Sequence, residues 1–122
     1  MEVNRTEDTM IVSWNQTFNA YWTRHGDRKE AKFDVHVEYE GPARAFMTDA
    51  SPIMAKIGEL EGKDLRQIAG RSSLESVVLH IKGIITPELQ GGDRLRRIYV
   101  LENDAFGVEL LEKSAEEVRI AA

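Results

Sequence analysis

The stretch that decides the fold is residues 9–22, TMIVSWNQTFNAYW, in which apolar and polar side chains alternate over an unusually long distance. The apolar parity holds Met10, Val12, Trp14, Phe18, Ala20 and Trp22. A period of two is typical of a β-strand with one face toward a core. Residues 33–40, FDVHVEYE, alternate in the same way and end at Gly41-Pro42. The two segments predict an antiparallel hairpin joined by a turn or loop over Thr23–Lys32.

The middle of the chain changes to a helical period. A first helix begins at Ser51-Pro52, with proline in its first turn, and ends near Gly62. A second helix begins at Ser72–Glu75, which fits a capping box, and stops at Pro87. The apolar stripes of the two predicted helices are formed by Ile53, Ile57 and Leu60, and by Leu74, Val77, Val78, Ile81, Ile84 and Ile85.

Two further strands are predicted, Arg97–Leu101 and Ala105–Leu111, with a tight turn at Asn103-Asp104. The element order is therefore strand, strand, helix, helix, strand, strand. This order predicts an α+β fold, a ββααββ antiparallel sheet with two helices on one face. We expect one domain over residues 1–122, with a core at about 9–111 and a charged tail or short helix at 112–122.

Composition narrows the function classes. The chain has 122 residues, 42% of them hydrophobic, no cysteine and a formal net charge of −5. Disulfides, thiolate metal sites and cysteine nucleophiles are excluded, and the acidic balance disfavours a nucleic-acid partner. No apolar run approaches the roughly 20 residues of a membrane span. Met1–Arg5 lacks a signal-peptide pattern, so we expect a cytoplasmic protein.

The polar faces of the first two strands share one side of the predicted sheet. They carry Ser13, Asn15, Thr17, Asn19, Asp34, His36, Glu38 and Glu40. Two interpretations remain open for this face: the wall of a wet tunnel inside an oligomer, or an ordinary solvated surface. The long first strand and the open sheet edges favour a homo-oligomer.

Four stretches, in order and spacing, resemble motifs of the T-fold (tunnelling fold) superfamily, and within it the 6-pyruvoyl- and 6-carboxytetrahydropterin synthases. They are Phe18–Trp22 (for F-x-A-x-H), Leu60–Leu65 (L-D-H-x-x-L), Ser72–Glu75 (P-T-x-E) and Val100–Asn103 (V-x-E-T). The resemblance spans roughly residues 10–111. It implies a T-fold whose barrel is completed by oligomerisation, as a trimer or hexamer.

The departures from these motifs concern catalysis. Family synthases hold zinc with three histidines, whose positions here fall on Trp22 and, by gapless counting, on Lys29 and Ala31. Alternatively, His25-Gly26-Asp27 is a shifted remnant of the family's H-G-H. The family's Asp-His pair reads Glu61-Gly62, and its catalytic cysteine is missing. We therefore expect no metal and no other cofactor.

The resemblance implies that Glu102 anchors a pterin-like ring through its N–H edge; alternatively, it is a loop-edge surface charge. A carboxylate accepts two parallel N–H bonds from a guanidine-like edge, which also fits other small planar heterocycles. Trp22 either stacks on such a substrate or fills the vacated metal cavity. Ser73 matches a family threonine beside the ring, although a helix-cap role explains it too, and Glu75 is interpreted as a capping residue.

His25 and Asp27 are candidate acid/base residues in the loop near the family's active site, and His36 is a candidate proton carrier on the polar sheet face, or merely solvated. The sequence thus favours a zinc-free, diverged lyase or cyclase of biosynthesis acting on a small heterocycle. A non-catalytic binding or scaffold protein is the alternative, and a different small α+β domain is a further possibility.

Overall fold

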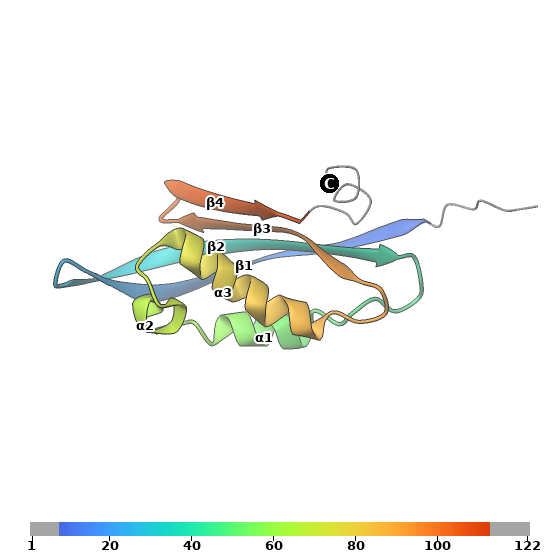
Figure 1. Cartoon of the computed structure of the whole chain (residues 1–122), viewed down its shortest axis with the longest axis horizontal. Helices are drawn as coiled ribbons and strands as arrows, with labels where there is room; N and C mark the ends of the chain where they lie inside the picture. Colours follow the sequence, from blue (N-terminus) through green and yellow to red (C-terminus); the bar gives the residue numbers. More distant parts are fainter. Residues whose placement is uncertain (1–7, 113–122) are drawn as a thin grey trace, which may run out of the picture.

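The computed structural model describes residues 8–112. Four antiparallel strands form one sheet in the order β1-β2-β3-β4, and helices lie along one face of it (Figure 1). The elements are β1 (Thr9–Arg24), β2 (Asp27–Pro42), α1 (Ser51–Gly58), α2 (Leu65–Ala69), α3 (Leu74–Ile85), the 3₁₀ turn η1 (Thr86–Glu88), β3 (Arg94–Glu102) and β4 (Phe106–Leu111).

The predicted α+β class and element order are confirmed, with a short helix, α2, added between the two expected ones. Predictions for Met1–Arg5 and for the tail beyond Glu112 lie outside the described residues. Within residues 8–112, no helix is long and apolar enough to cross a membrane.

The predicted loop over Thr23–Lys32 is wrong. β1 and β2 pair residue by residue from Thr9↔Pro42 to Arg24↔Asp27, so the ladder runs almost to the tip of the hairpin. The turn is only His25-Gly26, with φ of 53° and 81°, the left-handed pair that suits a twisted two-residue hairpin. The tip projects past the helices (Figure 1), so its charged residues show no apolar alternation although they are strand.

The core lies between the sheet and the helices. Phe18 stacks on Phe33 with ring centroids 5.2 Å apart, and Trp22 meets Phe33 edge-on at 5.8 Å. Below them pack the buried faces of α1 and α3, namely Ile53, Ile57, Leu74, Val77, Val78, Ile81 and Ile85. Met10, on the same parity of β1, is 46% exposed, so the apolar face of this strand is covered only toward the hairpin tip.

Helix boundaries differ from the sequence prediction at two points. α1 ends at Gly58, and the chain continues through turns to Leu60, which is still buried. The cap of α3 is Ser73, whose Oγ accepts a hydrogen bond from the Ser76 N–H at 3.2 Å. The predicted Ser72 cap is therefore wrong: the Ser72 hydroxyl instead donates to the Thr23 carbonyl at 3.0 Å and ties α3 to β1.

Part of the outer edge of β1 is covered within the chain. The Gly62 N–H donates to the Asn19 carbonyl at 2.7 Å, and the Tyr21 N–H donates to the Lys63 carbonyl at 2.9 Å. The Glu61 carboxylate accepts from the Asn19 N–H at 3.0 Å. The segment Glu61–Asp64 thus shields the edge near the hairpin tip, and no segment within residues 8–112 pairs with the edge nearer to Thr9.

Asp93, just before β3, connects the start of that strand to the segment that follows β2, through Arg44 and Thr48. Its side chain is fully buried, and its Oδ2 accepts from Arg44 Nη2 at 2.7 Å and from the Thr48 N–H and hydroxyl at 2.8 and 2.6 Å. Burial raises the pKa of Asp93, but the hydrogen bonds from Arg44 and Thr48 outweigh it and hold the pKa below its usual value. Asp93 Oδ1 packs against Gly41, where a Cβ would approach it to 1.9 Å, so only glycine fits there.

We predict that Asp93→Asn lowers the free energy of unfolding by about 1.5–3 kcal/mol at neutral pH, because a charge-assisted set of bonds is lost. A lowered native pKa stabilises the fold above the unfolded value of about 4, and this stabilisation is lost as the pH falls through the native value. Urea unfolding at pH 7 and at pH 3 should therefore show a smaller difference between wild type and variant in acid.

The matched control is Asp104→Asn, which removes an exposed carboxylate paired with Lys32 at 3.0 Å. An exposed pair of this kind contributes less than about 1 kcal/mol. A difference between wild type and Asp93→Asn that is equal at both pH values would contradict an ionic role for Asp93.

Candidate functional site

Glu102, the last residue of β3, lies where two cavities meet. It shares the parity of the buried Ile98 and Val100 and pairs with Phe33 of β2, so it belongs to the helix-covered face. One cavity, of about 280 Å³, is called the hairpin cavity and is lined by Trp22, His25, Asp27, Lys29, Glu30, Ala31, Glu102 and Asn103. The other, of about 450 Å³, is called the helix cavity and is lined by Ser72, Ser73, Leu74, Glu75, Glu102, Asn103, Ala105 and Phe106.

Trp22 fixes the orientation of the Glu102 carboxylate. The indole is 2% exposed, packs edge-on against Phe33, and donates its Nε1–H to Glu102 Oε2 at 3.0 Å. A carboxylate has about four lone-pair positions, so this bond leaves most of the acceptor capacity of Glu102 for other donors. Trp22 therefore fills space in the core, and it also aims a partly exposed carboxylate toward the cavities.

The turn after Glu102 is held by Asn103. Its side-chain oxygen accepts from the Lys32 N–H at 2.9 Å, and its own N–H donates to the Lys32 carbonyl at 2.8 Å. Asn103 and Asp104 both have positive φ, of 52° and 58°, which asparagine and aspartate tolerate better than most residues. The predicted turn at Asn103-Asp104 is present, and it anchors the end of β3 to β2.

Ser73 is the N-cap residue of α3, and this position places it at the helix cavity. Its hydroxyl is engaged by the cap bond to Ser76 N and lies 2.7 Å from Ser76 Oγ. Ser73 lines the helix cavity together with Glu102, while the exposed Glu75 lies in the same first turn. The helix-cap interpretation of Ser73 thus accounts for its hydroxyl, and its role toward a ligand stays a prediction.

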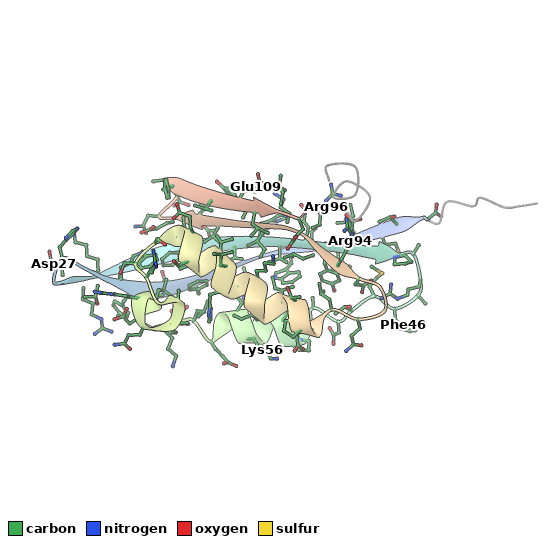
Figure 2. All side chains as sticks on the ribbon, viewed as in Figure 1. Asp27, Phe46, Lys56, Arg94, Arg96 and Glu109 are labelled. Atoms are coloured by element: carbon green, nitrogen blue, oxygen red, sulfur yellow. The ribbon has the colours of Figure 1, made fainter. Side chains whose placement is uncertain are left out.

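His25 and Asp27 lie at the tip of the β1–β2 hairpin and both line the hairpin cavity with Glu102. Figure 2 labels Asp27 at this end of the molecule. Both side chains are exposed, and neither has a hydrogen-bond or ion-pair partner among the described residues. The structure therefore brings His25, Asp27, Trp22 and Glu102 to one cavity.

His36 lies apart from this group. It alternates along β2 with the buried Val35 and Val37, so its side chain is on the opposite face of the sheet. Its ring nitrogens lie 2.9 Å from Asn15 Oδ1 and 2.8 Å from Glu38 Oε2. A catalytic role for His36 stays a prediction, and it would belong to a site on the polar face.

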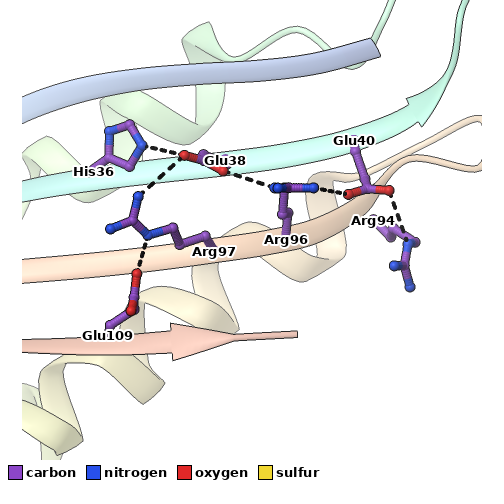
Figure 3. A network of polar contacts seen from close by, with 7 residues as sticks. All are labelled: His36, Glu38, Glu40, Arg94, Arg96, Arg97 and Glu109. Atoms are coloured by element: carbon purple, nitrogen blue, oxygen red, sulfur yellow. Dashed lines mark hydrogen bonds and ion pairs between the residues drawn. The ribbon is translucent and has the colours of Figure 1, made fainter. Parts of the chain in front are cut away.

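The polar face is built as a network of ion pairs rather than as a row of separate charges (Figure 3). Glu38 pairs with Arg96 at 3.1 Å and with Arg97 at 3.5 Å, and Arg96 also pairs with Glu40 at 3.1 Å. The hydrogen bond with His36, helped by Arg96 and opposed by burial, holds the pKa of Glu38 below its usual value. The basic stretch at 94–97 lies inside β3 and supplies the arginines of this network.

The three positions that the resemblance assigns to zinc ligands, Trp22, Lys29 and Ala31, line the hairpin cavity together. They do not fit a metal, because indole, ammonium and methyl groups offer no electron pair to a dication. Other residues that line the same cavity carry possible ligand atoms, namely His25, Asp27, Glu30 and Glu102. Within residues 8–112, no three His, Asp or Glu side chains are grouped so as to hold a metal ion.

Sequence reasoning did not single out two residues of this site. The sequence predicts Asn103 as a turn residue and as the last position of the V-x-E-T match, and its hydrogen bonds with the Lys32 backbone have no signal in a single sequence. Lys29 was considered only as a failed zinc ligand; in the structure its side chain shares the hairpin cavity with Glu102. The two-residue turn, which sets the register between Trp22 and Lys29, was the missing information.

Comparison with known proteins bears on the fold. No family model and no curated protein matches the sequence. Among solved structures, the chain is similar to 6-pyruvoyl tetrahydropterin synthase from Caenorhabditis elegans, with a TM-score of 0.71. The match covers 88% of this chain and 98% of that chain at 9% sequence identity. The chain therefore has the T-fold, as the motifs predicted.

We predict that the protein, purified without chelator, carries far less than one zinc per chain. The physical reason is that positions 22, 29 and 31 offer no ligating atom, and that the Lys29 ammonium repels a dication in the same cavity. Elemental analysis of the purified protein is the measurement. One tightly held zinc per chain, lost in a His25→Ala variant, would show instead that the shifted motif at 25–27 ligates.

Proposed function

We propose that this chain is a diverged pterin-synthase-like protein that binds a small planar heterocycle through Glu102 and acts on it, without zinc, as a lyase or cyclase. The observation that carries the proposal is the Trp22–Glu102 hydrogen bond at the junction of the two cavities. A carboxylate held in a fixed direction by a buried donor, yet still partly exposed, is the arrangement that a recognition site requires.

Recognition follows from the donor pattern of the ligand. A heterocycle with two adjacent N–H groups, as in a guanidine-like ring edge, donates two parallel bonds to one carboxylate. Glu102 supplies the acceptors, and the Trp22 indole forms a wall that keeps the carboxylate from rotating. The cavities, of about 280 and 450 Å³, are near the lower end of the ~300–1,000 Å³ range of small-molecule sites, which suits a compact ligand.

The acid/base work is assigned to His25 and Asp27. Both line the hairpin cavity, and neither is engaged by another described residue, so both are available to a bound ligand. Histidine is the usual proton carrier near neutral pH. Ser73 belongs to the opposite wall, beside the ligand in the helix cavity.

A non-catalytic binding protein is the second candidate function. It is favoured by one specific observation: positions 22, 29 and 31 carry no ligating group, while a carboxylate is present at position 102 and is held there by Trp22. Selective retention of the binding group is what a protein that binds without turnover requires. Ligand binding without any chemical change in the ligand would identify this case.

We further propose a homo-oligomer, trimer-based as the resemblance implies. The two outer strands of the sheet expose large apolar side chains, Met10 and Ile11 on β1 and Phe106 and Leu111 on β4. These exposed groups lie on open edges, where a second copy can add a strand. Because Phe106 also lines the helix cavity, a neighbour paired with β4 would close that side of the ligand site.

We predict that Glu102→Gln weakens binding of pterin, the probe with the required N–H edge, by about ten- to a hundredfold. One acceptor oxygen becomes a donor that faces the ligand's N–H, and a charge-assisted bond contributes roughly 1.5–3 kcal/mol. The glutamine oxygen still accepts from Trp22, so the melting temperature should hardly change. Calorimetric titration beside thermal unfolding measures both quantities.

The matched control is Glu75→Gln, which removes an exposed carboxylate from the same helix cavity and should leave pterin binding within about twofold. Early melting of Glu102→Gln would make Glu102 a structural residue. Unchanged pterin affinity in a well-folded variant would move the site away from Glu102.

We predict that Ser13→Pro reduces the oligomer to smaller species. The N–H groups of Asn19 and Tyr21 point to the outer edge of β1, so by the period of two the N–H of Ser13 does as well. Proline there removes an outward donor and leaves the inward ladder to β2 intact. Light scattering at micromolar concentration should show an oligomer for wild type and for the control Ser13→Thr. A 13.8 kDa monomer in the wild type would refute the assembly.

A further inference from the structure

A third cavity, called here the basic cavity, lies behind the hairpin tip and has a different electrostatic character. It measures about 410 Å³ and is lined by Thr23, His25, Arg66, Gly70, Arg71 and Ser72. Among the described residues, no carboxylate lines it, whereas the hairpin cavity is lined by Asp27, Glu30 and Glu102. In a chain with a net charge of −5, a cavity lined by two arginines and a histidine is a local reversal of charge.

Three elements bring these groups together. The end of β1 supplies Thr23 and the hairpin turn supplies His25, while α2 supplies Arg66. Gly70 caps α2 with a φ of +84°, a left-handed conformation that turns the chain and places Arg71 beside the same opening. The Ser72–Thr23 hydrogen bond then fixes this turn against β1. The Gly70 turn and the Ser72–Thr23 bond therefore hold the backbone from which Arg66 and Arg71 extend.

The two arginine side chains are uncompensated. Within residues 8–112, neither the Arg66 nor the Arg71 guanidinium makes a hydrogen bond or ion pair, and both residues are exposed. Elsewhere Arg44, Arg96 and Arg97 are each paired with a carboxylate. The Asp64 carboxylate accepts hydrogen bonds from the Arg66 backbone N–H at 3.0 Å and from the Thr23 hydroxyl at 3.2 Å, and it makes no ion pair with either guanidinium. Two unpaired cations on one cavity create an attractive field for an anion.

We propose that the basic cavity is an oxyanion site that takes a phosphate or carboxylate group between Arg66 and Arg71. Guanidinium forks bind such groups bidentately, and the His25 ring offers an N–H donor in either protonation state. His25 also lines the hairpin cavity, so the two cavities adjoin at this residue. The anion is either a free ion or an anionic substituent of the ligand held at Glu102, and the second source rests on the proposed function.

The site itself is tested with inorganic phosphate. Calorimetric titration at constant ionic strength, set with chloride to hold screening fixed, should show saturable binding to the wild type. The double variant Arg66→Gln/Arg71→Gln should bind phosphate at least tenfold more weakly. The control Lys56→Gln/Lys63→Gln removes the same charge from exposed lysines outside the cavity, and it should bind within twofold of the wild type. Thermal unfolding confirms that both double variants fold.

The source of the anion is tested with guanosine and guanosine 5′-monophosphate, which share a guanidine-like edge and differ by one phosphate. A substituent site predicts that the monophosphate binds at least tenfold tighter, and that Arg66→Gln/Arg71→Gln abolishes this gain. A free-ion site predicts phosphate binding that Glu102→Gln leaves unchanged, with no gain for the monophosphate.

The proposal is overturned if phosphate does not bind saturably and the monophosphate gains nothing over guanosine. It is also overturned if the lysine control loses as much affinity as the arginine variant, because the effect would then be one of net charge. The proposed function fails separately, if pterin binding is insensitive to Glu102→Gln while phosphate still binds.

Discussion

Burial of one face of the β1–β2 hairpin is the constraint on which the rest of the structure depends. The period of two along β1 sends Phe18, Ala20 and Trp22 to the helices, and it leaves the other parity on the opposite face, namely Asn15, Thr17 and Asn19. A shift of one residue in the register would exchange the two sets, so the buried aromatic stack fixes the pairing through to Arg24↔Asp27. That pairing in turn places Trp22 beside Lys29. The pairing of Phe33 with Glu102 in β3 brings the Glu102 carboxylate within hydrogen-bond distance of the Trp22 indole.

Those parts of the fold that rest on periodicity could be predicted from the sequence. The alternation in 9–22 and 33–40 and the apolar stripe over 74–85 gave the strands, the second helix and the sheet class, and the spaced motifs gave the T-fold. Glu102, Trp22, His25 and Asp27 were selected from the resemblance, and the structure brings the four to one cavity. Their roles stay predictions, because a cavity places residues without showing what binds there.

The errors occur where the deciding forces are not periodic. At the hairpin tip both faces are solvated, so Arg28, Lys29 and Glu30 carry no apolar signal although they are paired strand residues. Ser72 and Ser73 are both plausible caps of α3 in the sequence. In the structure the Ser72 hydroxyl donates to the carbonyl of Thr23, 49 residues earlier in the chain, and Ser73 is left as the cap. The pairing of Arg96 and Arg97 with Glu38 likewise needs the register of β3 against β2, which no local pattern contains.

The hairpin cavity shows how replacing a side chain that offers an electron pair by one that offers an N–H group changes the ligands a site can hold. An imidazole offers an electron pair to a metal, whereas an indole offers only a proton, and Trp22 gives that proton to Glu102. Lys29 occupies the second of the compared positions, and its ammonium group likewise has N–H donors and no lone pair to offer. A dication needs side chains that offer electron pairs, but two of the three compared positions offer only N–H groups. The hydrogen-bond acceptors of this cavity are the carboxylates of Asp27, Glu30 and Glu102. Such a mixture suits a neutral ring with both N–H and carbonyl groups better than a bare cation. The adjoining basic cavity adds the N–H donors of Arg66 and Arg71, which suit an anionic group.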